Sequence, residues 1–249
     1  DVLDEAEYVE VTGGEGNDTR LRISLHPLKD RERETNFENC VADVNIPVGE
    51  VFTSPVLNGT EGLLHVGNVY IGDFQFRDLR LRFEDGMVTD YSCANFPDPE
   101  AGRRLVRQVI LKNHDSLPMG EFAIGTNTVA YRAAERLGIT EKLPILIAEK
   151  MGPHFAVGDT CYSWSEDSPV YNPNGKEIIA RDNERSLLRK TEISRAYFNC
   201  HTDITIPYKE LGDIAAVAPD GTRRPVIRDG RFAVAGAEKL NAPLKESAG

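Results

Sequence analysis

The sequence has no excess of basic residues. Lys and Arg total 29 against 40 Asp and Glu, so the formal net charge of the 249 residues is −11. No run of basic residues interleaves with aromatic residues either, which argues against nucleic acid or an anionic membrane surface as the partner. The acidic balance favours solubility and suits the binding of cations.

Long hydrophobic runs are missing as well. The most apolar stretches, such as 143–148, are far shorter than the roughly 20 residues of a membrane-spanning helix. The N-terminus lacks the basic and apolar pattern of a secretory signal. We therefore expect a cytoplasmic protein with no membrane partner.

Closely spaced cysteines are absent too. The four cysteines are Cys40, Cys93, Cys161 and Cys200, and no two form a CxxC pair. This spread does not predict a disulfide framework, so a reducing compartment is the simpler assumption. The nucleotide-binding patterns GxGxxG and GxxxxGKS/T do not occur, so we expect no nucleotide chemistry.

Alternation of apolar and polar residues predicts strands over much of the chain. Residues 8–11 and 21–25 alternate around a turn rich in Gly and Asn, which predicts an opening hairpin. The step Asp85-Gly86 between two strand-like segments is a strong hairpin signal. Further strands are expected at 63–66, 74–83, 87–91, 155–157, 197–206, 214–217 and 225–234.

Helical spacing is evident in two segments, 99–112 and 128–137. Pro97-Asp98 supplies a start for the first, and Gly138 closes the second. Strands are grouped and no regular βαβ alternation occurs, which predicts an α+β fold of largely antiparallel β-sheet with a few helices. We expect one domain over residues 1–249, with a surface loop at 29–39 and an inserted loop at 163–195.

Two of the five histidines have carboxylates at informative spacings. His201 and Asp203 lie two residues apart in a strand-like segment, so both point to the same face, where they would suit one half of a divalent metal site. The alternative for the pair is a half-buried His with Asp as its partner, or a solvated face of the strand. Glu149 and His154 form the second pair, but Pro153 prevents a continuous helix between them, so only a turn would bring them together. The spacing of this pair alone favours the alternative, an exposed Glu and an unrelated His.

Two further acids stand in apolar surroundings. Glu50 and Glu121 each follow a glycine and are flanked by apolar residues. A carboxylate in such surroundings is costly unless a cation or hydrogen bonds receive it, although a strand-edge Glu that points to water is the simpler alternative for either one alone.

Taken together, these residues are four acids and two imidazoles. Such a mixed set of oxygen and nitrogen ligands suits a pair of divalent ions such as Zn, Co or Mn, because four carboxylates offset the charge of two ions. One carboxylate can bridge the ions, and a shared water would be acidified enough to yield hydroxide near neutral pH. The set therefore indicates metal-assisted hydrolysis.

At these same residues the sequence resembles a known family. Residues 45–55, NIPVGEVFTSP, are similar to the NIPxxEVFTxP block of the thermophilic aminopeptidases, the aminopeptidase T/aminopeptidase S group of two-metal exopeptidases. The blocks LRFEDG at 81–86, GEFAIGTN at 120–127, 149–158 and HTD at 201–203 follow in the family's order. Together these blocks cover roughly residues 40–206, and such a match is improbable by accident.

The resemblance implies a role for each matching position. The expected metal ligands are Glu50, Glu121, Glu149, His154, His201 and Asp203, which would hold two divalent ions (Zn, Co, Mn or Mg). Glu121 is the expected bridge between the ions and the catalytic group that moves the proton. A metal-bound hydroxide would attack the first peptide bond of a peptide substrate with a free N-terminus, and the family's habit implies a homodimer.

The chain also departs from the family pattern. A family tyrosine proposed to steady the tetrahedral intermediate is matched most nearly by Tyr162, one residue further from His154 than the family has it. The alternative is a packed surface aromatic beside Trp164. Family chains carry an N-terminal α/β domain ahead of the matched region, and we expect it to be absent here, so that residues 1–249 form the catalytic part of a longer family fold.

Two other functions compete with the aminopeptidase. A catalytically impaired domain of the same fold would bind metal or peptide without turnover, and the departure at Tyr162 favours it. A metal-free glycosidase would use Glu50 and Glu121 as its two carboxylates, but it leaves His201 and Asp203 unexplained.

Overall fold

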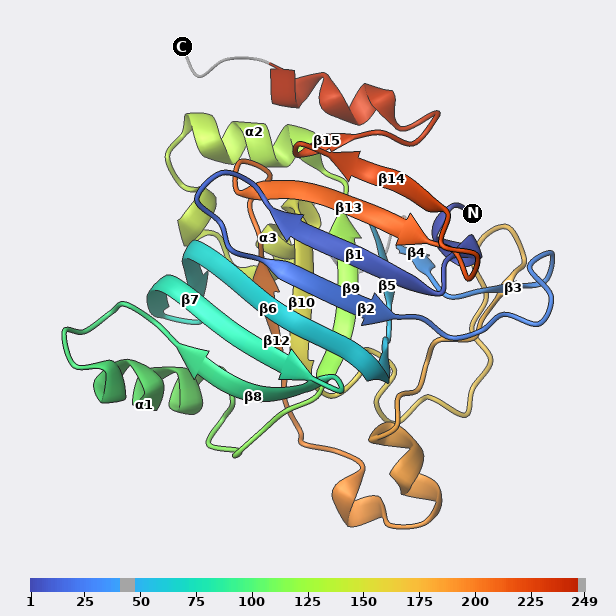
Figure 1. Cartoon of the computed structure of the whole chain (residues 1–249), viewed down its shortest axis with the longest axis horizontal. Helices are drawn as coiled ribbons and strands as arrows, with labels where there is room; N and C mark the ends of the chain where they lie inside the picture. The colour runs from blue at the N-terminus through green and yellow to red at the C-terminus, as the bar shows by residue number, and fades with distance from the viewer. Residues whose placement is uncertain (41–47, 246–249) are drawn as a thin grey trace.

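Two antiparallel sheets packed face to face make up the body of the molecule (Figure 1). The computed structural model describes residues 1–40 and 48–245, so residues 45–47 of the first family block lie outside the described residues. The predicted α+β class, largely antiparallel with few helices, is confirmed.

Within the described residues the larger sheet has eight strands, in the order β15-β14-β13-β1-β2-β6-β7-β8. Their bounds are β1 Tyr8–Gly13, β2 Arg20–Ser24, β6 Val56–Ile71, β7 Phe74–Glu84, β8 Met87–Ser92, β13 Leu211–Val217, β14 Arg223–Arg228 and β15 Arg231–Phe232. The turn between β7 and β8 places both Asp85 and Gly86 at positive φ, 43° and 68°, as a tight two-residue hairpin requires.

The smaller sheet has five described strands, in the order β12-β10-β9-β5-β4. Their bounds are β4 Glu38–Cys40, β5 Glu50–Thr53, β9 Met119–Gly125, β10 Pro153–Gly158 and β12 His201–Thr205. A short parallel pair, β3 Glu34–Thr35 with β11 Glu177–Ile178, lies apart from both sheets.

Helices border the sheets. α1 Pro99–Val109 lies beside β8, and α2 Thr128–Arg136 lies near the C-terminal segment at the other end of the molecule (Figure 1). Asp98 caps α1 by accepting a hydrogen bond from the Glu100 amide at 3.0 Å. The remaining short helices are α3 Ile145–Ala148, η1 Leu3–Glu5, η2 Thr140–Lys142, η3 Glu149–Met151, η4 Ser186–Lys190, η5 Ile193–Arg195, η6 Glu238–Asn241 and η7 Pro243–Lys245. No helix in the described ranges has the length and apolar character needed to cross a bilayer.

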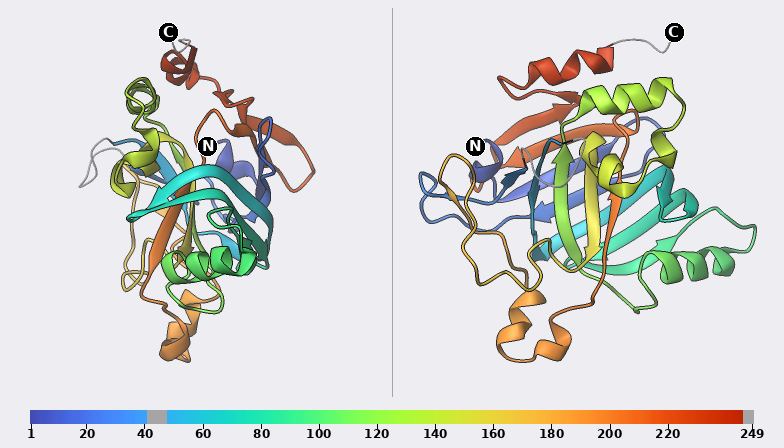
Figure 2. Two further views of the ribbon diagram at one scale, coloured as in Figure 1. Left: turned by 90° about the vertical axis from the view of Figure 1, so that its left-hand side faces the viewer. Right: turned by 180° about the vertical axis from the view of Figure 1, so that it is seen from behind.

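The smaller sheet has two different faces. On β9, Phe122 and Ile124 pack into the core between the sheets, whereas Glu121 and Ala123 point the other way. On β10, Phe155 belongs to the core and His154 to the opposite face. Figure 2 (right) shows β9, β10 and β12 in front of the larger sheet, so the face that carries the polar residues is the one turned toward the viewer. The two-residue period of the strands therefore separates core from site.

Most predicted elements are confirmed, and the errors are local. The hairpin at 8–11 and 21–25, the hairpin at Asp85-Gly86 and both helices are present. The loop prediction for 29–39 is wrong in part, because β3 and β4 begin there. The prediction of an insertion at 163–195 stays a prediction, and this segment holds β11, η4, η5 and many turns.

The strand predicted at 197–206 begins only at His201. The amides of Phe198 and Asn199 donate to the carboxylate of Asp159, at 2.7 and 2.8 Å, instead of to a neighbouring strand. Asn199 also adopts a φ of 55°, which no extended strand allows. The side chain of Asp159 therefore fixes the point at which β12 starts.

The core between the sheets predicts a large cost for one substitution. Phe155 is fully buried and stacks on Phe122 with ring centroids 5.5 Å apart. We expect Phe155→Ala to lower the free energy of unfolding by about 3–5 kcal/mol, because it leaves a cavity that the sheets do not close. Urea denaturation measures this change. Phe74→Ala, at a side chain that is 48% exposed, is the control. Equal losses in the two variants would contradict this account of the core.

Candidate metal centre

A cavity of about 260 Å³ opens on the polar face of the smaller sheet. All six predicted ligands line it. The lining residues are Glu38, Cys40, Glu50, Phe52, Glu121, Leu146, Glu149, Lys150, His154, Cys161, His201 and Asp203. Residues more than 150 positions apart in sequence, such as Glu50 and Asp203, thus meet in one site.

The strand register leaves room for these side chains. Each of the five predicted ligands on strands is paired, on at least one neighbouring strand, with Gly or Ala. The pairs are Glu50 with Gly125, Glu121 with Ala156, His154 with Ala123, His201 with Gly158, and Asp203 with Ala156. Directly paired side chains share a face of the sheet, so these small residues keep the space between the polar groups open.

Glu149 reaches the cavity by another route. It lies in η3 Glu149–Met151, directly before β10, and the backbone at Gly152 is fully extended between the two elements. A close approach fixes this link, because a Cβ at Gly152 would lie 2.8 Å from the Ile206 carbonyl oxygen. Glu149 and His154 thus line the same cavity, whereas the spacing of the pair alone favoured an exposed Glu and an unrelated His.

The carboxylate of Glu121 lies between the two imidazoles. Its Oε1 is 3.5 Å from His154 Nε2, and its Oε2 is 3.1 Å from His201 Nε2. Each imidazole Nδ1 lies near a backbone carbonyl oxygen, that of Gly152 at 3.2 Å for His154 and that of Asp159 at 2.7 Å for His201. This contact holds the ring so that Nε2 points into the cavity, the arrangement found when histidine binds a metal.

Burial and mutual charge shift the pKa values of the cluster. Burial opposes the charged form of His154, but the hydrogen bond and charge of Glu121 outweigh it and raise the pKa to about 9. Burial also opposes ionisation of Glu121, yet the two imidazoles hold the pKa of this carboxyl far below its ordinary value. Burial raises the pKa of both Glu50 and Glu149. The buried cavity therefore disfavours the charged forms of Glu50 and Glu149, and a cation beside these carboxylates would offset that cost.

One buried carboxylate oxygen of the cluster is suited to bind a cation. Glu50 is only 4% exposed, and its Oε2 accepts no hydrogen bond from any residue in the described ranges. It lies 3.4 Å from His154 Nε2. A buried carboxylate oxygen without a donor is costly, and a divalent ion between Glu50, Glu121 and His154 would remove that cost. The ligand atoms of these three residues all lie within 4.8 Å of one another, so the residues fit a metal.

Lys150 is a site residue that the sequence does not single out. Its side chain is 3% exposed, and its ammonium group pairs with Glu50 Oε1 and with Glu149 Oε1, the latter at 3.1 Å. Burial lowers its pKa, but these carboxylates outweigh burial and raise it. In the sequence, Lys150 is marked only by its position next to Glu149. Its main partner, Glu50, is 100 residues away, so no local pattern indicates their contact.

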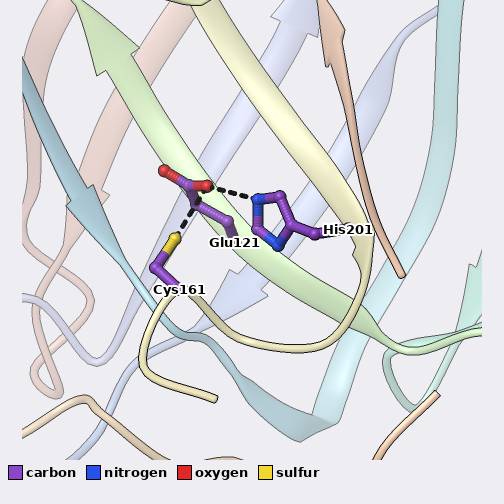
Figure 3. Close-up of side chains that lie close together, drawn as sticks. All are labelled: Glu121, Cys161 and His201. Atoms are coloured by element: carbon purple, nitrogen blue, oxygen red, sulfur yellow. Dashed lines mark hydrogen bonds and ion pairs between the residues drawn. The ribbon is translucent and has the colours of Figure 1, made fainter. Parts of the chain in front are cut away.

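Cys161 also enters the site without a sequence signal. Its Sγ lies 3.0 Å from Glu121 Oε2 (Figure 3). Tyr162, the predicted catalytic tyrosine, does not line the cavity. Its hydroxyl donates to Glu38 Oε2 and its ring packs on Phe52, with centroids 5.9 Å apart.

Tyr162 is not the surface aromatic beside Trp164 that the alternative interpretation predicted. Tyr162 is buried, with 6% exposed. Trp164 stacks on Tyr197 instead, with ring centroids 4.1 Å apart. Because the Tyr162 hydroxyl binds Glu38, which does line the cavity, its catalytic role stays a prediction.

Known proteins match this chain over most of its length. Residues 1–232 match the family described as thermophilic metalloprotease (M29). Aminopeptidase T of Thermus thermophilus is 25% identical over 193 residues, which are 76% of this chain and 40% of that protein. Aminopeptidase 2 of Geobacillus stearothermophilus is 28% identical over 196 residues, again 76% of this chain and 40% of that protein.

A solved structure has the same fold. Wild-type AmpT from Thermus thermophilus matches 92% of this chain and 50% of its own with a TM-score of 0.56 and 20% identity. The chain thus spans about half the length, or less, of the relatives it matches.

The pKa of His154 predicts a pH dependence of the metal-free chain. Because folding raises this pKa from 6.5 to about 9, the charged imidazole stabilises the fold fully below pH 6.5. That contribution, up to about 3 kcal/mol, is lost as the pH rises through 9. Urea unfolding with a chelator present should therefore show the deficit of His154→Gln relative to the unaltered chain shrinking between pH 6 and pH 10.

His114→Gln is the control for this measurement, because His114 packs on Phe198 outside the cavity. Its stability relative to the unaltered chain should not follow the same course. A deficit of His154→Gln that stays constant from pH 6 to pH 10 would contradict the charged state assigned to the imidazole.

Proposed function

Because the chain belongs to the M29 family of thermophilic metalloproteases, we propose that it is an aminopeptidase that uses two divalent ions to release N-terminal residues from peptides. The relatives named aminopeptidase T and aminopeptidase 2 support this assignment. A cytoplasmic homodimer is the form we propose for the protein.

The observation that carries the proposal is the position of Glu121. Its two carboxylate oxygens face two different imidazoles, His154 and His201. Glu50 completes the set on the side of His154, and Asp203 lies 3.3 Å from His201 Nε2 on the other side. All five of these residues, together with Glu149 from the lining of the same cavity, would hold the two ions.

The charge of the cavity supports two ions. Five carboxylates line it, and Lys150 neutralises one of them. With both imidazoles neutral, as metal ligands are, four negative charges remain, which two divalent ions balance. When bound, such ions polarise a carbonyl and acidify a water molecule.

The chain's own residues have distinct tasks in hydrolysis. Glu121 is the acid–base group: it takes a proton from the attacking water and passes it to the departing amine. Lys150 holds Glu50 and Glu149 in place, and the backbone carbonyls of Gly152 and Asp159 orient the two imidazoles. Such orientation reduces the reorganisation required during the reaction.

An alternative within the same fold is a domain that binds metal or peptide without turnover. One observation favours it: the hydroxyl of Tyr162 is bound to Glu38 and does not line the cavity. The presence of all six predicted ligands around one cavity favours the enzyme.

Metal removal distinguishes the two. Chain loaded with zinc or cobalt should release p-nitroaniline from an aminoacyl p-nitroanilide, chelated chain should not, and reloading should restore the rate. An N-acetylated substrate should stay intact, because an aminopeptidase requires the free amino group. A loaded chain that binds substrate without cleaving it would support the binding domain.

Substitution of the shared carboxylate tests its role. Glu121→Gln keeps the shape of the side chain but removes its charge and basicity, so we expect the turnover rate to fall by about 10²–10⁴-fold and metal retention to weaken. Glu84→Gln, at the exposed end of β7, is the matched control and should keep full activity. Full activity in Glu121→Gln would refute the assigned role.

A further inference from the structure

Cys161 is held at the metal centre by its neighbours in the chain. It follows β10 in a loop, where the Asp159 amide donates to the Cys200 carbonyl at 2.7 Å and Thr160 Oγ1 donates to the Arg181 carbonyl at 3.3 Å. The Asp159 carbonyl in turn contacts His201 Nδ1. One short loop therefore fixes both Cys161 and the orientation of His201.

The sulfur shares its contact atom with the imidazole. Cys161 Sγ lies 3.0 Å and His201 Nε2 lies 3.1 Å from Glu121 Oε2. Figure 3 shows the two side chains approaching this oxygen from different sides. Their ligand atoms and that of Glu121 all lie within 4.8 Å of one another, a second group beside the one formed by Glu50, Glu121 and His154.

An independent observation also indicates a cation at this second group. Asp203 is 8% exposed, and its Oδ1 accepts no hydrogen bond from a described residue while lying 3.3 Å from His201 Nε2. Asp203 thus offers a fourth donor beside His201, and four is the number of ligands that zinc takes in tetrahedral sites.

We propose that Cys161 is a thiolate ligand of the metal ion held by Glu121, His201 and Asp203. This inference rests on the proposed function, since it concerns one of the same two ions. Ligand atoms around a tetrahedral zinc are about 3.5 Å apart, so the contacts of Glu121 Oε2 with Cys161 Sγ and His201 Nε2, at 3.0 and 3.1 Å, need to expand by about 0.5 Å. The metal takes the place of the thiol proton, which leaves to solvent.

An ion can reach Cys161 from solvent, and the sulfur ligand favours particular metals. Residue 161 is exposed, and a second cavity of about 440 Å³ borders Cys161 and His201 on the solvent side. A soft sulfur ligand favours zinc or cobalt over magnesium or manganese at this position. A thiolate adds one negative charge to the balanced cavity, and the ammonium group of a peptide N-terminus would offset it.

Cobalt loading tests the proposal without an activity assay. Chain loaded with Co²⁺ should show a near-ultraviolet sulfur-to-cobalt charge-transfer band, and Cys161→Ser should lose it while circular dichroism stays unchanged. Cys200→Ser is the matched control, because this thiol lies next to His201 in sequence but does not line the metal cavity, and it should keep the band. A band retained in Cys161→Ser would overturn the proposal.

X-ray absorption of the zinc-loaded, unaltered chain tests the same contact without any substitution. One sulfur per two zinc ions is expected, and zinc shells of nitrogen and oxygen alone would overturn the inference. The two proposals would fail in different ways. A chain that takes up neither cobalt nor zinc would contradict both of them. A chain that binds these metals without a sulfur ligand would contradict only the proposal for Cys161.

Discussion

Repulsion among buried carboxylates is the interaction on which the site depends. Glu50, Glu121 and Asp203 are each less than one-tenth exposed and lie around one cavity. Like charges in so small a volume destabilise a fold unless cations are placed among them. Lys150 and two imidazoles meet part of this need, and the unsatisfied oxygen of Glu50 marks where more positive charge belongs. The assignment of a metal centre follows from that charge imbalance.

The fold provides a rigid support for this costly cluster. Phe122 and Phe155 fasten the inner face of the smaller sheet to the larger one, while Gly and Ala opposite the polar residues keep its outer face open. Since strands hold side chains more precisely than loops do, the apolar core determines the geometry of the charged groups. Loss of packing between the sheets would therefore disturb the ligands without touching them.

Sequence patterns could predict the ligands better than the strands that carry them. His201 and Asp203 follow from a period of two, and Glu50 and Glu121 from charge in apolar surroundings. Alternation of apolar and polar residues does not predict the strands β5 and β9. In β9 the reason is that the strand is buried on both faces and its residues are nearly all apolar or small. The roles of Lys150 and Cys161 could not be predicted from the sequence for another reason. Their partners in the site lie 100 and 40 residues away, and no local pattern encodes such contacts.

The most direct test of this account is the number of metal ions per chain after incubation with zinc or cobalt and removal of free metal. Elemental analysis should give close to two, and the number should fall in Glu50→Ala and in His201→Ala, which remove one ligand from each side of Glu121. A value near zero for the unaltered chain would contradict the central claim that this cluster of carboxylates and imidazoles is a metal centre.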